Sequence, residues 1–330
     1  MQPLDPRSLS LLDRWQRGFP LTPEPYAVLA RDAGATTDEI VEALERLSAL
    51  GILSRVGATI RPNTAGASLL CAMRVPQDRL EAVAAIVNEE PGVNHNYERE
   101  HAFNLWFVLT GASPIALGAA LERIRRASGL EALELPLEKS YFIDLGFPLS
   151  GIHQADPASL RKPTTAALGA VLLDDVDRAL LAALGPGLAI CSRPYRALGA
   201  MAGLKEDETI SRLSRLIASG VISRFGLILR HRALGYTANA MAVWDVADAR
   251  VDEVGELLAR QPSVTLCYRR PRRLPHWPFN LFCMVHGRER NVVAAEIEAL
   301  SNLAGLERNA RAVLFSRHCF RQRGACLKAA

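Results

Sequence analysis

The 330-residue chain lacks the features that mark metal-rich, secreted or membrane proteins. Its six cysteines never form a CxxC pair, which argues against zinc or disulfides and for reduced, buried thiols. No segment approaches the ~18 consecutive apolar residues of a membrane-spanning helix. The formal net charge is only +4, so charge alone does not require a nucleic acid or membrane partner. We therefore expect a cytoplasmic protein with no metal of its own.

What the sequence does contain is a repeat of itself. Residues 25–57 align without gaps to residues 194–226, at a constant offset of 169 (194 minus 25). In each copy, helical segments and a short strand region predict a small winged helix-turn-helix. The segment that follows predicts the order strand, helix, strand, strand, helix, strand, with the last strand of the first copy over residues 133–145. That order is typical of a ferredoxin-like sandwich with helices on one face of its sheet.

The predicted fold class is therefore α+β, with two tandem copies of a winged helix-turn-helix followed by a ferredoxin-like βαββαβ domain. The predicted segments are winged helices at 1–62 and 173–232, ferredoxin-like domains at 63–148 and 233–330, and a linker at 149–172. The linker is rich in Pro, Ala, Ser and Thr and has no amphipathic period. We expect the open sheet faces of the two copies to pack together as a pseudo-dimer.

The most informative stretch is GVNHNYEREHAFNLWFVLTG, residues 92–111. Read with a period of two, it predicts a strand with Val93, His95, Tyr97 and Arg99 on one face. A short break follows, and then a second strand in which large apolar residues alternate. The pair predicts an antiparallel hairpin with ionisable side chains near its bend.

A second copy of this hairpin lies at residues 263–287. Its Tyr268 corresponds to Tyr97, but Leu266 replaces His95, and its connecting loop is five residues longer. The longer loop carries arginines beside a histidine and a tryptophan, namely Arg269, Arg270, Arg272, Arg273, His276 and Trp277. Four guanidinium groups in one loop favour an anionic partner over a merely solvated surface.

These residues carry a resemblance to a known family. A helix-turn-helix followed by a ferredoxin-like domain is similar to the Lrp/AsnC regulators. The signatures HNYEREHAFNLWF and CYRRPRRLPHWPFNLFCMVHG resemble those of the siroheme decarboxylases of the fused NirDL type. The resemblance implies that the carboxyl groups of two acetate side chains of siroheme are removed to give 12,18-didecarboxysiroheme, in heme d1 biosynthesis. It also implies that the two copies form one unit, and it leaves a further homodimer open.

The same resemblance places the essential histidines at His95, His101 and His276. Siroheme carries eight carboxylates around a flat apolar macrocycle, so its site needs cations at the rim and apolar walls. The residues expected to bind it are Arg99, Arg269, Arg270, Arg272, Arg273, Trp106, Trp277, Asn104 and Asn280.

A pyrrole-linked acetate loses carbon dioxide most easily when the adjacent ring carbon is first protonated, because the ring then accepts the electrons of the breaking bond. The proton donor needs a pKa near neutral, which favours histidine. We expect His95 or His101 to be the general acid, with Tyr97 or Tyr268 orienting the carboxylate. No external cofactor is required, since the iron arrives with siroheme. A histidine acting as an axial ligand of that iron is an alternative role.

Two other functions stay open at this point. One is a DNA-binding regulator of the Lrp/AsnC type, whose recognition helix would span residues 37–50. That segment carries four carboxylates and a single arginine, so DNA phosphates would repel it, and we expect no DNA partner. The other is a heme or tetrapyrrole sensor or carrier without catalysis, because the same cleft would serve binding alone.

Overall fold

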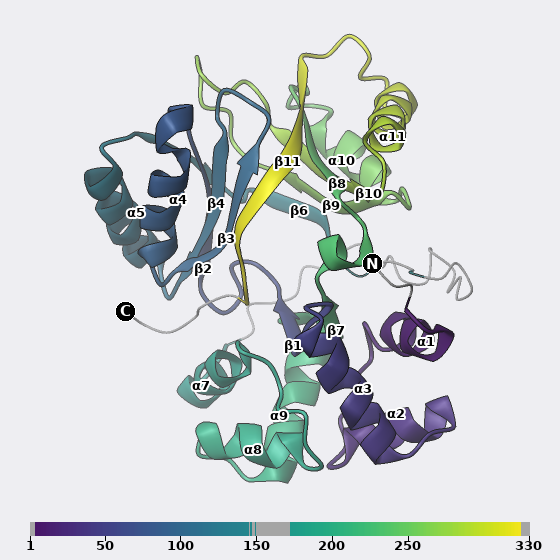
Figure 1. Ribbon diagram of the computed structural model, residues 1–330. Helices are drawn as coiled ribbons and strands as arrows, with labels where there is room; N and C mark the ends of the chain where they lie inside the picture. The colour runs from purple at the N-terminus through teal and green to yellow at the C-terminus, as the bar shows by residue number, and fades with distance from the viewer. Residues whose placement is uncertain (1–3, 145, 147–148, 150–171, 325–330) are drawn as a thin grey trace. The chain divides into compact units, whose positions relative to one another are not determined.

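The computed structural model describes residues 4–144, 146, 149 and 172–324, so most of the predicted linker lies outside the described residues. The chain divides into two compact units. The first combines the two winged helices, mainly from residues 4–65 and 172–234, and the second combines the two ferredoxin-like copies. Each unit therefore contains elements from both halves of the sequence, as the colours in Figure 1 show.

In the winged-helix unit, each copy contributes three helices and one strand among the described residues. These elements are α1 (Pro6–Arg14), α2 (Pro25–Ala33), α3 (Thr37–Ala49), β1 (Leu53–Ile60), α7 (Asp175–Leu184), α8 (Pro194–Met201), α9 (Glu206–Ala218) and β7 (Ile222–Leu229). Strands β1 and β7 pair with each other in an antiparallel sheet. The Tyr26 hydroxyl donates to the Ala189 carbonyl at 3.0 Å, and the equivalent Tyr195 hydroxyl donates to Pro20 at 2.6 Å. The same contact, made in both directions, joins the two copies.

Local sequence explains the ends of these helices. Helix α3 begins with a capping box in which Thr36 and Glu39 satisfy each other's backbone N–H groups. Its apolar face buries Leu44 and Leu47. Gly51 follows the helix with a φ of +70°, a conformation that favours glycine and stops the helix.

The second unit is built around one nine-stranded sheet in the order β5-β2-β4-β3-β11-β8-β10-β9-β6. The first copy contributes β2 (Ala67–Met73), α4 (Leu80–Glu89), β3 (Val93–Arg99), β4 (Leu105–Gly111), α5 (Pro114–Ser128), β5 (Ala132–Pro136) and β6 (Lys139–Ile143). The second contributes β8 (Ala238–Trp244), α10 (Val251–Ala259), β9 (Val264–Arg269), β10 (Leu281–Gly287), α11 (Arg290–Leu303) and β11 (Arg311–Gln322). A short 3-10 turn occurs at Gln77–Arg79 in this unit, and another occurs at His231–Leu234 in the winged-helix unit.

The predicted single strand over residues 133–145 is wrong, because the segment forms two strands. Strand β5 pairs with β2 of its own copy, whereas β6 pairs with β9 of the second copy. Pro136 ends β5, since proline has no N–H to continue the ladder. In the second copy, the single strand β11 pairs with both copies. Its first part pairs with β8 of its own copy, and its second part pairs with β3 of the first copy.

Apolar side chains fill both faces of the sheet. One core lies under α4 and α5, and a second lies under α10 and α11 (Figure 1). A third core, on the faces without helices, mixes residues of both copies, including Trp106, Tyr268, Trp277, Phe282 and Leu314. The predicted packing of the open faces against each other is therefore confirmed.

One detail of the first hairpin differs from prediction. Val93 pairs with Leu109 and belongs to the core under the helices, whereas His95 and Tyr97 pair with Val108 and Trp106 on the open face. A register shift between Val93 and His95 causes the change of face. A period of two cannot reveal such a bulge, because the extra residue moves everything after it to the other side.

No helix in the described ranges is both long and apolar enough to cross a membrane. The five cysteines within these ranges are free thiols, as predicted, but only Cys71, Cys267 and Cys283 are buried, whereas Cys191 and Cys319 are half-buried. Cys326 lies outside the described residues.

Candidate functional site

Two arginines reach across the interface between the copies. Arg99 ends β3, and Arg270 follows β9. Nη1 of Arg99 donates to the carbonyl of Leu314 at 3.1 Å, and Nη1 of Arg270 donates to the carbonyl of Leu135. Since Leu314 belongs to the second copy and Leu135 to the first, the two contacts are equivalent under the internal repeat.

Both arginines are buried without a compensating carboxylate. Arg99 is 7% exposed and Arg270 is 8% exposed, and the Nε atom of each has no hydrogen-bond partner within the described chain. Burial lowers the pKa of both guanidinium groups, and only tyrosine or cysteine side chains act in the opposite direction. A buried cation without a counter-charge is costly, so this pair favours an anionic ligand.

Tyr268 lies close to both cations. The guanidinium carbon of Arg270 is 4.7 Å from the centroid of its ring, and burial raises the pKa of Tyr268 while the charges of Arg270 and Arg99 oppose the rise. Its phenol is therefore a neutral hydrogen-bond donor at pH 7. In the first copy, the rings of Tyr97 and His95 stack with centroids 6.1 Å apart, and Arg99 lies 5.7 Å from the Tyr97 ring.

An aromatic cluster joins the two hairpin loops. Trp277 of the second copy is fully buried, and its ring centroid lies 5.4 Å from His101, 5.1 Å from Trp106, 6.1 Å from Phe103 and 4.9 Å from Phe279. The indole N–H of Trp106 donates to Phe103, but Nε1 of Trp277 is buried with no partner among the described residues. The structure thus brings together the predicted His101, Trp106 and Trp277.

A cavity of about 250 Å³ opens beside this cluster. Its lining residues are Arg74, Phe103, Glu131, Ala132, Leu133 and His276. The wall therefore combines apolar side chains with one guanidinium, one imidazole and one carboxylate. It also combines both copies, since only His276 comes from the second.

Arg74 is the cationic residue of this cavity that sequence reasoning missed. It follows β2 directly, as a single charge at the end of an apolar run. The internal repeat contained the signal, because the second copy has Asp245 at the equivalent position. A reversal of charge between two otherwise matching copies marks a position where the copies differ in role.

His101 is held in one tautomer. Its Nδ1 accepts a hydrogen bond from the backbone N–H of Phe103 at 3.0 Å, so the neutral ring carries its proton on Nε2. Burial lowers the pKa of His101, and the positive charge of Arg74 lowers it further. At neutral pH this imidazole is therefore uncharged and offers one N–H donor.

Two of the predicted substrate-binding arginines are already paired within the protein. Arg269 lies 2.9 Å from Glu138, and Arg272 lies 2.6 Å from Asp245 and 2.7 Å from Asp248. The hydrogen bond from Arg272, together with its charge, lowers the pKa of Asp248. Because their charges are balanced locally, these two arginines are weaker candidates for carboxylate binding than Arg99 and Arg270.

Two other predicted residues, His95 and Arg273, are not among the residues that line the cavity. His95 lies within β3 with its ring stacked on Tyr97, whereas His101 lies in the bend after the strand and contacts Trp277. Arg273 donates to the carbonyl of Arg272 at 3.2 Å and forms a backbone bridge with Trp277, so it shapes the loop.

The predicted substrate ligands Asn104 and Asn280 fasten their loops to the neighbouring strand ends. The side chain of Asn280 accepts from the N–H of Val246 and donates to its carbonyl, both at 2.9 Å, and Asn104 makes the same pair with Val75. We expect Asn280→Ala to lower the free energy of unfolding by about 2 kcal/mol, because it leaves the buried N–H of Val246 unpaired, while the Val246 carbonyl keeps its hydrogen bond from Arg272. Urea unfolding would measure this, with the exposed Asn302→Ala as control. Unchanged stability with weakened ligand binding would instead assign Asn280 to the substrate.

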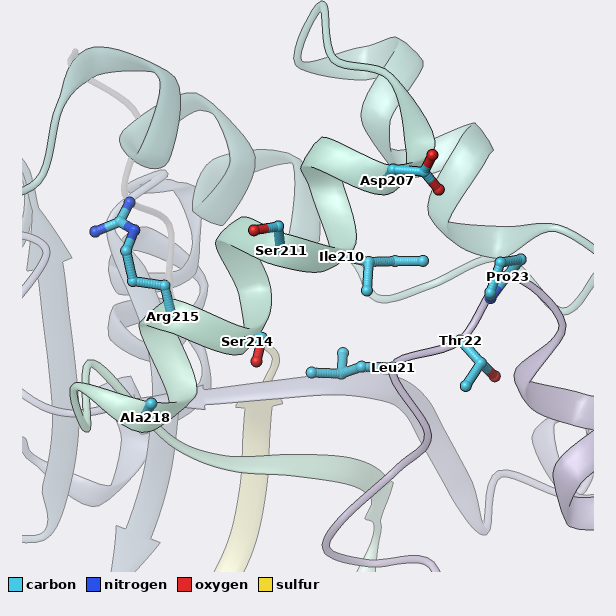
Figure 2. Close-up of a pocket in the computed structure, with 9 residues that line it drawn as sticks. All are labelled: Leu21, Thr22, Pro23, Asp207, Ile210, Ser211, Ser214, Arg215 and Ala218. Carbon is cyan, nitrogen blue, oxygen red and sulfur yellow. The ribbon is translucent and has the colours of Figure 1, made fainter.

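A larger cavity, of about 640 Å³, lies in the winged-helix unit. Figure 2 shows the loop of Leu21, Thr22 and Pro23 opposite the side chains of α9. Its lining has no histidine, and its Arg215 is bound to the buried Asp177 at 2.6 Å. This cavity therefore lacks the imidazole that is expected of the proton donor. Across the described residues, no cluster of three or more His, Cys, Asp or Glu side chains is placed to hold a metal ion.

The fold and the site together define a class of protein. The chain matches the model of the AsnC-like ligand binding domain twice, over residues 65–141 and 233–321. It also matches the siroheme decarboxylase NirDL-like HTH domain over residues 9–53 and 177–222. It is thus a fused pair of winged-helix and AsnC-like ligand-binding domains, as the sequence predicted.

Comparison with individual proteins narrows this class. The chain is 47% identical over 328 residues to the siroheme decarboxylase NirDL subunit of Paracoccus denitrificans, with 98% of each chain covered. It is 31% identical to the siroheme decarboxylase of Hydrogenobacter thermophilus, covering 93% of this chain and 90% of the relative. The crystal structure of a siroheme decarboxylase NirDL with an iron-uroporphyrin III analogue is 26% identical and aligns with a TM-score of 0.67, covering 97% of this chain and 93% of that one. The chain belongs to the siroheme decarboxylase family and is a decarboxylase.

Proposed function

We propose that this chain removes the carboxyl groups of two acetate side chains of siroheme to give 12,18-didecarboxysiroheme, in heme d1 biosynthesis. The observation that carries the proposal is the pair of buried arginines, Arg99 and Arg270, that have no carboxylate partner in the described chain. A polycarboxylate ligand supplies the missing negative charge. The aromatic cluster beside them suits a flat apolar macrocycle.

The size of the cavity limits how the substrate sits. At about 250 Å³ it is smaller than the 300–1,000 Å³ typical of pockets that enclose a ligand. It therefore takes one edge of the macrocycle, with its reacting acetate, rather than the whole ring. The complex of a related NirDL with an iron-uroporphyrin III analogue supports a tetrapyrrole ligand for this family.

The proposed reaction uses two proton transfers for each carboxyl group. A protein acid first protonates the ring carbon adjacent to the one that bears the acetate. The bond between the methylene and the carboxylate then breaks, its electrons move into the ring, and carbon dioxide leaves. A second proton adds to the methylene to form the methyl group, and the first proton is lost from the ring. One proton is consumed overall, and no external oxidant, reductant or cofactor is required.

His276 is the best-placed proton donor in this scheme. Its side chain lines the cavity, whereas His95 is not among the lining residues. His101 is a less suitable proton donor, because its Nδ1 accepts from the Phe103 N–H and its lowered pKa leaves the ring uncharged at neutral pH. The same tautomer makes His101 a poor axial ligand, since the nitrogen left to face iron carries the proton. We assign His101 a hydrogen-bonding role through Nε2–H, and we assign Tyr97 and Tyr268 to orienting carboxylates.

DNA binding is the less favoured function. The arginines of α9 are engaged within the unit, where Arg212 lies 2.9 Å from Asp174 and Arg215 lies 2.5 Å from Asp177. Helix α3 has an acidic first turn. Neither helix offers the free cations that phosphate contacts need.

Anaerobic incubation of the purified protein with siroheme, followed by mass analysis of the tetrapyrrole, tests the proposal. We expect the loss of two carboxyl groups. Tight binding without a change in mass would favour the carrier or sensor function. No binding at all would favour the winged helices as the functional part, and a DNA-binding assay would then be the next experiment.

A further inference from the structure

We infer that Arg74 binds a propionate carboxylate beside the reacting acetate and so turns that acetate toward His276. The inference rests on the proposed function and adds a positioning contact to it. In siroheme each ring carries an acetate and a propionate on adjacent carbons. A group that holds the propionate therefore fixes the position of the acetate.

The surroundings of Arg74 leave its charge available. Its guanidinium carbon lies 4.4 Å from the centroid of the Phe103 ring, on the wall of the cavity. Glu131 is the single carboxylate among the six lining residues, and it lies 3.5 Å from Arg125. No carboxylate of the described chain forms an ion pair with Arg74. Its positive charge lowers the pKa of His101.

The second copy has no equivalent of this contact. Asp245 occupies the corresponding position and is bound to Arg272 at 2.6 Å. The correspondence is fixed by structure, because the next residue in each copy, Val75 or Val246, pairs with the matching loop asparagine. The carboxylate contact at Arg74 is therefore specific to one side of the site, and it distinguishes one edge of the substrate from the others.

The reacting carboxylate is a poor partner for Arg74. An ion pair would stabilise the carboxylate relative to neutral carbon dioxide, and so would raise the barrier to its loss. A propionate has no such conflict, because it keeps its charge throughout the reaction. The apolar wall at Phe103 and Leu133 is then left for the acetate.

Arg74→Gln tests the inference, with Arg126→Gln as a control that removes an exposed charge from α5 of the same unit. We expect the KM for siroheme to rise about 10- to 100-fold in Arg74→Gln, because a charge-assisted contact is lost. We expect kcat to fall as well, by more than threefold, because the acetate is no longer held toward His276. Arg74→Lys should recover part of the affinity, and Arg126→Gln should behave as the native protein does.

The pKa of His101, measured by NMR in the free protein, gives a second readout. It should rise in Arg74→Gln and stay unchanged in Arg126→Gln, which shows that the variant is folded and that the charge acts at this site. An unchanged KM, or a kcat that increases because a paired carboxylate has been released, would overturn the inference. Absence of decarboxylation by the native protein would instead reject the proposed function itself.

Discussion

Arg99→Met and Arg270→Met are each expected to weaken siroheme binding about 10- to 100-fold, while the free protein keeps or gains stability. The loss of affinity follows because each guanidinium offers charge-assisted hydrogen bonds to a carboxylate. The stability follows because methionine of similar size removes a buried cation that has no counter-charge. Titration with siroheme and thermal unfolding of the same samples would measure both effects.

The alternative role for these arginines is structural, as a brace that stabilises the interface between the two copies. Each does donate to a backbone carbonyl of the other copy, so this alternative has an observable basis. A brace predicts a lower melting temperature and unchanged affinity, which is the opposite pattern. Arg308→Met, which replaces an exposed arginine, is the control for loss of one positive charge.

His276→Ala is expected to lower kcat about 10²- to 10⁴-fold, the usual contribution of a general acid. Affinity should change little, since the arginines provide the charge that holds the substrate. His318→Ala replaces an exposed histidine outside the cavity and should retain full activity. Single-turnover decarboxylation would separate the chemical step from binding. If His276→Ala stays within threefold of the native protein and His101→Ala is inactive, His101 is the acid.

The repeat made most of the fold predictable. Two matching segments with the same order of elements predicted paired winged helices and paired ferredoxin-like domains, and the open faces do meet as expected. The exchange of β6 and β11 between copies could not be predicted. Periodicity reports which face of a strand is buried, but it does not report which strand lies beside it.

The sequence predicted which residue types form the site, but it did not predict which arginines pair with carboxylates of the protein. Sequence reasoning found His101, His276 and the arginine-rich loop, and the structure places the first two at one cluster and cavity. It could not separate Arg270, which has no counter-charge, from Arg272, which is paired, because the aspartates that pair with Arg272 lie more than twenty residues earlier. It missed Arg74 because a single arginine after a strand is ordinary until the fold places it beside His276.

Turnover in deuterated water is the measurement that tests the central claim most directly. The native protein would be incubated anaerobically with siroheme in D₂O, and the product would be analysed by mass and by NMR of its methyl groups. The proposed chemistry predicts the loss of two carboxyl groups and one deuterium in each of the two new methyl groups. A tetrapyrrole recovered with all its carboxyl groups, or new methyl groups without deuterium, would contradict the account.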